Sequence, residues 1–312
     1  MRTQAVKAPS FADVTVDTTV QEKAIAFPTD ARLYFKGREW LVRLAKAHGI
    51  ELRQSYRRKA RQALFMQHRY AAVRQMRRAR RELKRSKIYL GRVHRDLQRK
   101  LPAQLEFVRE QFAEPLRRVA RLLAQQRNDK NKLYALHAPE AECIAKGNAH
   151  KKYEFGIKVS LAATQRDNFI VGALALPGNP FDGHTLQSAL NQVERLTGHK
   201  TQRCFVDRGY RGHGIQDTAV YIAGQKRGLT RALRRALKRR NAIEPIIGHT
   251  KHDGLMGRNY LKGTSGDAMN AILAAAGHNL RIILRKLRLS WLHFLNAVLT
   301  DLAMTRRMGA AI

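Results

Sequence analysis

The 312-residue sequence predicts an α/β fold: a mixed sheet with flanking helices, interrupted by a large, basic, all-helical insertion. Three observations predict this class. Alternating β-branched segments typical of strands lie near the N-terminus and again after residue 150. The long stretch between them has apolar residues at the three-four spacing of helices, and its charge is strongly positive. Beyond it, strand-like and helix-like segments alternate along the chain, as they do in an α/β sheet.

The first predicted strand is "FADVTVDTTV", residues 11–20, in which Val14 and Val16 alternate with polar neighbours. Asp17 follows Val16 directly, so we expect its side chain to point from the middle or the end of this strand to the working side of the sheet.

The middle of the chain predicts an antiparallel helical hairpin over about residues 60–127. Two apolar stripes follow the helical spacing, and Pro102 separates them because it cannot continue a helix. Residues 51–100 hold 18 Lys and Arg against 3 Asp and Glu. That excess is too large for paired salt bridges, so we expect a phosphate-facing surface; a solvated charged face without function is the alternative. The stripes consist of Met76, Ala79, Leu83, Leu90, Val93 and Leu97, then Leu105, Val108, Phe112, Leu116, Val119 and Leu123.

The second half of the chain completes the predicted sheet. Strands are expected at 152–162 and 168–176, then a helix from about His184 to Leu196, a strand that ends at Asp207 and a short strand within "DTAVYIAG". A helix from about Thr230 to Asp253, an apolar helix at 266–287 and a shorter helix near the C-terminus follow.

The overall charge limits the class of partner. The chain has 60 Lys and Arg against 24 Asp and Glu, a formal net charge of +36. DNA or RNA is the expected partner, because neutralised phosphates release counterions. A membrane surface is the weaker alternative, since the longest uncharged runs are too short to cross a bilayer. Cys143 and Cys204 form no CxxC pair, which predicts buried thiols in a reducing cytoplasm, close to the nucleoid.

Acidic residues are scarce, so those at strand ends carry information. Asp207 ends a strand in "CFVDRGYRG", where Gly209 and Gly212 turn the chain away. Ligands of α/β sheets collect at the carboxyl ends of strands, so Asp17 and Asp207 meet if their strands are adjacent. Glu244 offers a third carboxylate on a packed helix. Three carboxylates suit Mg²⁺ or Mn²⁺.

Two basic residues accompany Glu244. Arg240 lies four residues before it and Lys251 seven residues after it, so helical periodicity puts all three side chains on one face. A carboxylate with cations on both sides suits a site that binds a phosphodiester. Asp30 is a rival for the first carboxylate, but its position in "FPTDARLY" is more typical of a helix cap.

Several segments resemble one known family. "DTTV", "VDRGYRG" and the pattern RxxxExxxxxxK from Arg240 to Lys251 resemble the three catalytic regions of DDE transposases. "KYEFGIKVS", "LPGNPFDGHTL", "GQKRG", "AIEPIIGHTKHDGLMGRNYLKG" and "GHNLR" are similar to bacterial transposases of the insertion-sequence-five group. The resemblance extends from about residue 13 to residue 287, and its segments occur in the order that the family has.

The resemblance implies a ribonuclease-H-like fold and metal-dependent cleavage and joining of DNA. Asp17, Asp207 and Glu244 would be the catalytic and metal-binding triad, which holds two Mg²⁺ or Mn²⁺ ions. The implied partners are double-stranded DNA, as terminal inverted repeats and as target, and a second copy of the chain. The expected DNA-binding residues are Arg240 and Lys251, Arg208, Lys226 and Arg227 of "GQKRG", and Arg77, Arg78 and Arg81 of the helical insertion.

The expected domain organisation follows from this alignment of segments. Residues 1–35 start the catalytic domain with its first strand, 36–140 form the basic insertion, 141–288 complete the ribonuclease-H-like domain, and 289–312 form a C-terminal helix or tail. Leu237 departs from the family, which has a Tyr three residues before the Arg of the pattern. Members of the group usually carry an N-terminal region that recognises the terminal repeats. Because only a short segment precedes the first strand, a truncated or alternative-start product is expected.

Two other functions remain open from the sequence. One is a non-catalytic nucleic-acid-binding protein whose helical hairpin is the working part, and the other is a ribonuclease-H-like nuclease without strand transfer. Individual residues also have simpler interpretations. His249 and His252 do not predict zinc without further ligands, and Tyr210 either stacks on a base or packs against the following helix. His278 and Asn279 are expected as buried hydrogen-bonding residues, and Asp182 as a cap or a residue that lines DNA.

Overall fold

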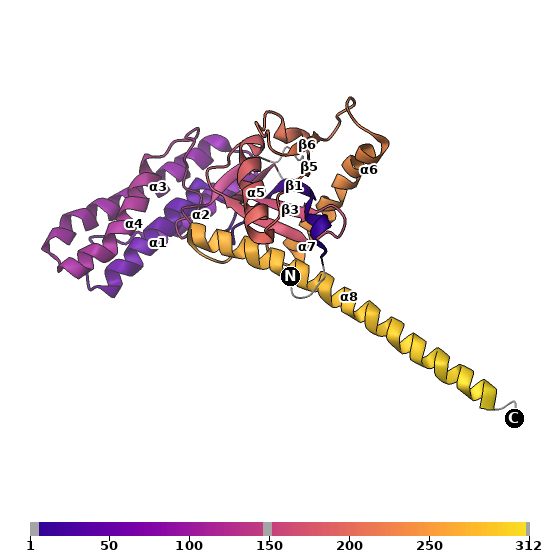
Figure 1. Cartoon of the computed structure of the whole chain (residues 1–312). Helices are drawn as coiled ribbons and strands as arrows, with labels where there is room; N and C mark the ends of the chain where they lie inside the picture. The colour runs from indigo at the N-terminus through magenta and orange to yellow at the C-terminus, as the bar shows by residue number, and fades with distance from the viewer. Residues whose placement is uncertain (1–5, 146–151, 310–312) are drawn as a thin grey trace. The chain divides into compact units, whose positions relative to one another are not determined.

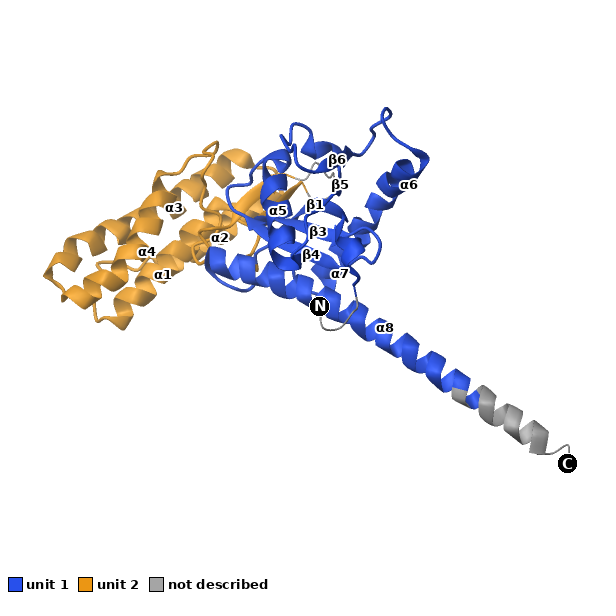
Figure 2. Ribbon diagram, in the orientation of Figure 1, with its two compact units in different colours: residues 1–23, 156–312 blue, residues 24–155 orange. Residues whose placement is uncertain are grey.

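The computed structural model describes residues 6–145 and 152–309. The chain divides into two compact units (Figure 2). Unit 1 comprises residues 1–23 and 156–312 and contains most of the sheet, whereas unit 2 comprises residues 24–155 and is largely helical.

The sheet has six strands, and its order is β2-β3-β1-β5-β6, with β4 also paired to β3. It is mixed, because β1 runs antiparallel to β3 and parallel to β5. The strands are β1 (Asp13–Glu22), β2 (Glu142–Ala145), β3 (Tyr153–Thr164), β4 (Ile170–Leu176), β5 (Arg203–Val206) and β6 (Ala219–Ile222). The strands expected on both sides of the helical region are therefore confirmed, with shifts of one or two residues at their ends.

The expectation that an insertion interrupts the sheet is wrong. β1 and β3 flank the helical region in the sequence, yet they pair directly and without a break from Val14↔Thr164 to Glu22↔Gly156. The helices connect the two strands without entering their ladder of hydrogen bonds. Such a long connection costs little extra free energy, because the entropy of loop closure grows only slowly with length.

Helices cover both faces of the sheet in unit 1 (Figure 1). One face packs on α5 (Asp182–Thr197), where the core includes Val14, Val16, Leu186 and Val193. The opposite face packs on α7 (Ile243–His252) and the first part of α8 (Gly263–Gly309), where Val159, Leu161 and Ala163 of β3 meet Ile246 and Ala274. These alternate β3 residues lie on one side because successive strand side chains point to opposite faces.

Two predicted helices have different bounds in the structure. The segment expected as one helix from Thr230 to Asp253 is α6 (Arg231–Arg239), a 3₁₀ turn at Arg240–Ala242 and then α7. Pro245 lies in the first turn of α7, where its missing N–H costs nothing, and it favours a new helix start over a continuous helix. The two helices expected after residue 266 are a single helix, α8. Every described side chain from Leu284 to Ala297 of α8 is exposed.

Unit 2 contains four helices within the described residues: α1 (Asp30–Ala47), α2 (Arg57–Ala72), α3 (Met76–Lys100) and α4 (Glu106–Ala124). α3 and α4 form the predicted hairpin, with Pro102 in the 3₁₀ turn Leu101–Ala103 between them. The hairpin begins at Met76 and not near residue 60, because residues 60–72 belong to the separate helix α2. Most of the two predicted stripes are buried against α1, although Met76 and Leu105 at the helix starts are exposed. The hairpin is thus one half of a larger helical core that α1 completes.

Smaller expectations also meet the structure here. Thr29, and not Asp30, caps α1, because its side chain accepts a hydrogen bond from the backbone N–H of Arg32. Cys204 is buried as expected, whereas Cys143 is only half-buried. Among the described residues, no helix is long and apolar enough to cross a membrane.

Candidate active site

Asp17 and Asp207 lie at neighbouring positions of two parallel strands. β1 and β5 pair from Asp13↔Arg203 to Thr15↔Phe205. Continuing this register by two residues places Asp17 opposite Asp207, just beyond the end of β5. The sequence places both acids there because an apolar run buries each strand and ends at the carboxylate. The Asp207 side chain accepts a hydrogen bond from the backbone N–H of Gly209 (2.9 Å), which fixes it at the turn after β5.

The carboxyl group of Asp17 is strongly affected by this environment. Burial and the neighbouring charge of Asp207 raise its pKa from 3.8 to about 6, although Arg240 and the backbone N–H of Thr18 lower the pKa in part. Burial disfavours the charged form because the surroundings solvate it less well than water does. Such a perturbed carboxylate in a cluster of charged groups is typical of a functional site.

Arg240 joins the first carboxylate to Glu244. Its guanidinium donates to Asp17 (Nη1 to Oδ2, 3.2 Å) and lies 3.8 Å from a carboxylate oxygen of Glu244. The Arg240 side chain is only 10% exposed, whereas the Glu244 side chain is 67% exposed. The predicted contact between Arg240 and Glu244, four residues apart, is therefore present. Arg240 reaches Asp17 because the 3₁₀ turn before α7 packs it beneath the sheet's edge.

Asp182 is a fourth carboxylate at this place, and sequence reasoning missed its position. It is the first residue of α5, but its side chain does not cap that helix. Instead it accepts hydrogen bonds from Thr18 Oγ1 (2.9 Å) and Lys158 Nζ (3.1 Å). A β-carbon on Gly209 would lie 3.1 Å from a carboxylate oxygen of Asp182 and equally close to one of Asp207. The two carboxylates therefore lie no farther apart than twice that distance. The abundance of turn residues around Asp182 obscured this role, because an acid before a helix is usually a cap.

Tyr210 lies among these acids. Its side chain is fully buried and packs in the core below α5. Burial raises the pKa of the Tyr210 hydroxyl well above its usual range, and the charges of Asp17, Asp182 and Asp207 raise it further. Its hydroxyl oxygen has no hydrogen-bond partner among the described residues. Tyr210 thus packs against α5, which precedes it in the chain, and not against a following helix as one interpretation of the sequence expected.

The predicted basic residues of unit 1 lie on three segments. The Arg208 guanidinium lies against Gly224, where an added β-carbon would approach it to 2.7 Å, so Gly224 and its positive φ leave room for this contact. Arg208 therefore brings the loop with Lys226 and Arg227 next to the turn after Asp207, and both loop side chains are exposed. Lys251 lies in the last turn of α7, two helical turns after Glu244. The predicted Arg77, Arg78 and Arg81 belong to α3 in unit 2 and are exposed.

The donor chemistry of this site fits a divalent metal ion, although its geometry is incomplete. Asp17 and Asp207 offer oxygen ligands, which Mg²⁺ and Mn²⁺ prefer, and the charge of Asp207 adds to burial in raising the pKa of Asp17. Yet no group of three or more His, Cys, Asp or Glu within the described residues is arranged to hold a metal ion. Glu244 points its carboxylate toward Arg240 and solvent, so it does not complete a cage.

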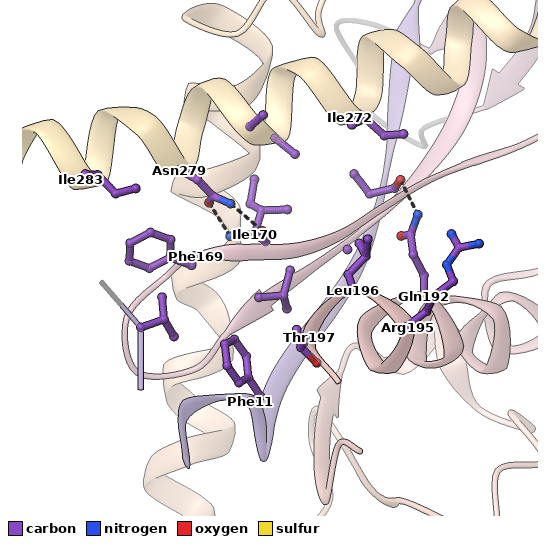
Figure 3. Close-up of a pocket in the computed structure, with 16 residues that line it drawn as sticks. Phe11, Phe169, Ile170, Gln192, Arg195, Leu196, Thr197, Ile272, Asn279 and Ile283 are labelled. Atoms are coloured by element: carbon purple, nitrogen blue, oxygen red, sulfur yellow. Dashed lines mark hydrogen bonds between the residues drawn. The ribbon is translucent and has the colours of Figure 1, made fainter. Parts of the chain in front are cut away.

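The remaining candidates have structural partners. His249 pairs with Asp253 (2.9 Å) and not with a cluster of metal ligands. The ring of His278 hydrogen-bonds the carbonyl of Asn168, and Asn279 binds both the N–H and the carbonyl of Ile170 at the start of β4. Figure 3 shows Asn279 at an apolar pocket of about 430 Å³ between β4, α5 and α8. Asp17, Asp207 and Glu244 do not line that pocket.

Comparison with known proteins matches parts of the chain. Residues 137–280 match the family model of the transposase DDE domain, a range that includes Asp182, Asp207 and Glu244 but not Asp17. An uncharacterized protein of Rhizobium meliloti, ORF8 in the nfe locus, is 56% identical over 75 residues, which cover 24% of this chain. Those residues span 36% of the length of that relative. No solved structure matches the chain.

The family match has direct chemical consequences. Transposases of the DDE family are catalytic and generally use divalent metal ions, and a transposase binds DNA. Asp17 lies outside the matched residues but pairs with Arg240 within them, whereas Arg77, Arg78 and Arg81 lie outside them. The match shows a transposase DDE domain in residues 137–280 of this chain.

Proposed function

We propose that the chain is a DDE transposase of the insertion-sequence-five group, which cleaves the DNA ends of its element and joins them to target DNA. One observation carries the proposal: Asp17 and Asp207 lie side by side on parallel strands, and Arg240 links Asp17 to Glu244. The DDE domain match and the net charge of +36 support it, because the substrate would be a polyanion.

The three acids would be the metal ligands of this reaction. Asp17, Asp207 and Glu244 would hold two Mg²⁺ or Mn²⁺ ions, with Glu244 turning from Arg240 toward the other two carboxylates. Divalent ions bound there would activate the attacking water or 3′-hydroxyl and stabilise the leaving oxygen. Asp182 would act as a positioning residue, since it fixes Thr18 next to Asp17 and holds Lys158.

Arg240 has two roles in this proposal. In the present geometry it pairs with Asp17 and offsets the charge of that carboxylate. When phosphate and metal ions enter, its guanidinium would turn from the carboxylates to a phosphodiester oxygen, as Arg is well suited to do. Lys251, Arg208, Lys226 and Arg227 would contact the same strand from α7 and from the loop after β6, and Arg77, Arg78 and Arg81 would hold flanking duplex.

The domain scheme is part of the proposal. Unit 1 would be a ribonuclease-H-like catalytic domain, an inference supported by its mixed sheet, in which β1 is antiparallel to β3 and parallel to β5. Unit 2 would be a DNA-holding accessory domain. The protein would act on DNA in the cytoplasm, at the nucleoid.

We also propose that two copies pair on DNA through α8. Leu280, Leu284, Leu287, Trp291 and Phe294 follow a four-three spacing and are each 57–63% exposed, a pattern typical of a helix that packs on an identical helix. Sedimentation velocity tests this: the wild-type chain should sediment as a dimer, and a Leu287→Glu/Trp291→Glu variant as a monomer. A monomeric wild-type chain, with or without DNA, would contradict it.

A cleavage assay tests the catalytic assignment. The purified chain with Mg²⁺ and DNA that carries the element's ends should nick that DNA, and chelation of the metal should stop the reaction. Asp207→Asn and Glu244→Gln should abolish nicking and leave DNA affinity within about twofold, because neither removes a positive charge. Glu194→Gln, which neutralises an exposed acid of α5, is the matched control and should cut normally.

The alternatives give different results in the same experiments. If the wild-type chain binds DNA but never cuts it with Mg²⁺ or Mn²⁺, the chain is a non-catalytic DNA-binding protein. If Asp207→Asn and Glu244→Gln both cut at the wild-type rate, the assignment of the triad is wrong. Pre-cleaved ends with free 3′-hydroxyls distinguish a transposase from a plain nuclease, because only the transposase joins them to a second DNA molecule.

A further inference from the structure

A polar hollow of about 270 Å³ lies on unit 2, within a region that no part of the proposed reaction uses. Three arginines of the hollow come from α3: Arg92, Arg95 and Arg99. The second and third follow the first by three and seven residues, so all three lie on one face of the helix. A fourth, Arg53, comes from the segment between α1 and α2. All four are exposed. The hollow thus gathers arginines that are about forty residues apart in the sequence.

A buried acid holds the two sides of this hollow together. Asp96, which is 6% exposed, accepts a hydrogen bond from the backbone N–H of Arg53 (2.9 Å). Its carboxylate also lies 3.7 Å from Lys100. Asp96 therefore fixes the segment of Arg53 against α3, but its charge is shared with Lys100 and does not neutralise the arginines.

Tyr56 forms another wall of the hollow. Its hydroxyl accepts a hydrogen bond from Arg92 (3.3 Å), and its ring stacks on Tyr89 with centroids 4.9 Å apart. The backbone of Tyr56 is left-handed, with φ of 54°, a conformation that costs an L-residue about 1–2 kcal/mol. In this conformation the aromatic ring and the hydroxyl of Tyr56 lie beside the guanidinium of Arg92.

The arginines of the hollow have too few carboxylates around them to balance their positive charge. Within the described part of the chain, no carboxylate lies within ion-pair distance of the guanidinium groups of Arg53, Arg92, Arg95 and Arg99. The arginines nearer the start of α3 differ: Arg81 and Arg85 both lie close to Glu82, at 3.7 and 2.8 Å. Like charges held together at a surface repel one another by about 1 kcal/mol or more per close pair, and a bound anion removes that cost.

The arginines of the hollow also continue a longer row. Arg78, Arg81, Arg85, Arg92, Arg95 and Arg99 follow a three-four spacing along one exposed side of α3. At 1.5 Å per residue, the row from Arg78 to Arg99 extends over about 32 Å, close to the roughly 34 Å of one turn of B-DNA. A polyanion that follows the helix therefore meets the hollow at its C-terminal end.

We propose that this hollow is a binding site for one backbone phosphate of DNA. The planar guanidinium groups of Arg92, Arg95 and Arg53 form bidentate hydrogen bonds to its non-bridging oxygens, which is the chemistry that arginine provides for phosphates. Arg99 donates its Nε–H to the carbonyl of Arg95 (3.1 Å). This hydrogen bond fixes the orientation of the guanidinium and leaves its other N–H groups for a ligand. The proposal rests on the proposed function only in naming DNA as the source of the phosphate.

The salt dependence of DNA binding tests this site. The affinity of the full chain for a duplex of about 20 base pairs is measured by fluorescence anisotropy between about 50 and 200 mM KCl. An Arg92→Gln/Arg95→Gln variant should bind about tenfold more weakly, and the slope of log affinity against log salt should become shallower by about one, the value for one lost phosphate contact. Arg109→Gln/Arg117→Gln on α4 removes the same charge and is the control, which should keep the wild-type slope. Circular dichroism and Tm check that both variants are folded.

The other outcomes overturn the proposal. An unchanged slope in the Arg92/Arg95 variant, or an equal change in the α4 control, would show that the hollow holds no particular phosphate. Titration with inorganic phosphate distinguishes a free anion: if calorimetry shows phosphate binding that only the Arg92/Arg95 variant loses, while the DNA slope stays unchanged, the ligand is not the DNA backbone. Failure of this site shows as an unchanged salt slope, whereas failure of the proposed chemistry shows as DNA left uncut by the wild-type chain with Mg²⁺, so the two failures are distinguishable.

Discussion

The two compact units handle charge in opposite ways. In unit 1, Asp17, Asp182 and Asp207 converge around the buried hydroxyl of Tyr210, and cations such as Arg240 are packed in to offset them. In unit 2, arginines cover the exposed side of α3, and two buried acids of that helix, Glu82 and Asp96, pair with groups beside them. Unit 1 thus gathers carboxylates at a partly buried site, whereas α3 of unit 2 displays exposed positive charge.

Because of this difference, pH and salt concentration are expected to act on different parts of the protein. Charges that are buried respond to proton concentration, because desolvation shifts their pKa values. Charges that are exposed respond to salt, because mobile ions screen them and are released when DNA binds. Substitutions in unit 1 are therefore expected to change the dependence on pH and metal, and those in unit 2 the dependence on ionic strength.

The largest expected effect is a loss of DNA affinity when positive charge is removed from the surface of unit 2. Replacing Arg77, Arg78 and Arg81 together by Gln should weaken binding of duplex DNA by about a hundredfold or more near 150 mM salt and reduce the salt slope by about three, one for each lost phosphate contact. Anisotropy titrations at several salt concentrations measure both quantities. If the affinity falls while the slope is unchanged, the arginines act on folding and not on phosphates.

A smaller and opposite effect is expected from the buried acid of unit 1. Asp17 has a pKa of about 6 in the folded chain against 3.8 for the free group, so the folded state binds the extra proton between these values. Stability from this group is therefore greatest below pH 4 and is lost as pH rises to about 6. Each pKa unit corresponds to about 1.4 kcal/mol. Asp17→Asn should raise the free energy of unfolding above pH 7 by about 2 kcal/mol, somewhat less than the full shift implies, because the amide pairs less strongly with Arg240.

Urea unfolding of the wild-type chain and Asp17→Asn at pH 4.5 and pH 8 measures this effect, and the difference between the two proteins cancels the other titrating groups. The gain at the lower pH should be about a third of the gain at pH 8, because pH 4.5 lies only slightly above the pKa of the free group. Asp13→Asn is a suitable control, since Asp13 pairs with Arg203 at the exposed start of β1. A variant that is less stable than wild type at pH 8 would show that the Arg240 ion pair outweighs the burial of charge.

The smallest expected effect concerns Tyr210. A buried tyrosine hydroxyl that donates a hydrogen bond contributes about 1 kcal/mol, but this hydroxyl has no partner among the described residues. Tyr210→Phe should therefore leave the free energy of unfolding within about 0.5 kcal/mol, or raise it slightly. Chemical denaturation in the absence of divalent ions is the measurement. A decrease of more than about 2 kcal/mol in the free energy of unfolding would show that the hydroxyl has a hydrogen-bond partner. The hydroxyl could then no longer be counted as an unpaired polar group among the acids.

The sequence predicted the strands and the acids because their signals are local. Alternation of Val14 and Val16 identifies β1, and the apolar run before Asp207 identifies the end of β5. The contact between Arg240 and Glu244 also agrees with a spacing of four residues, although Arg240 lies in the 3₁₀ turn before α7.

What the sequence did not predict depends on contacts between distant residues. Asp182 resembles a helix cap locally, and only the fold brings Thr18 and Lys158 to it. The hollow of unit 2 was equally hidden, since Arg53 reaches α3 only through the buried hydrogen bond to Asp96. The direct pairing of β1 with β3 was missed for the same reason, because no local pattern shows that two strands so far apart share a ladder.

Asn279 and Gln192 cover backbone groups of β4 with hydrogen bonds from their side-chain amides. The amide of Asn279 binds the N–H and the carbonyl of Ile170 (2.8 and 2.7 Å), and Gln192 donates to the carbonyl of Ala173 (3.0 Å), both on β4 (Figure 3). Backbone groups of an edge strand that remain open can template the addition of a foreign strand. The two amides occupy such groups, so they shield part of this short, apolar strand from pairing with the strand of another chain.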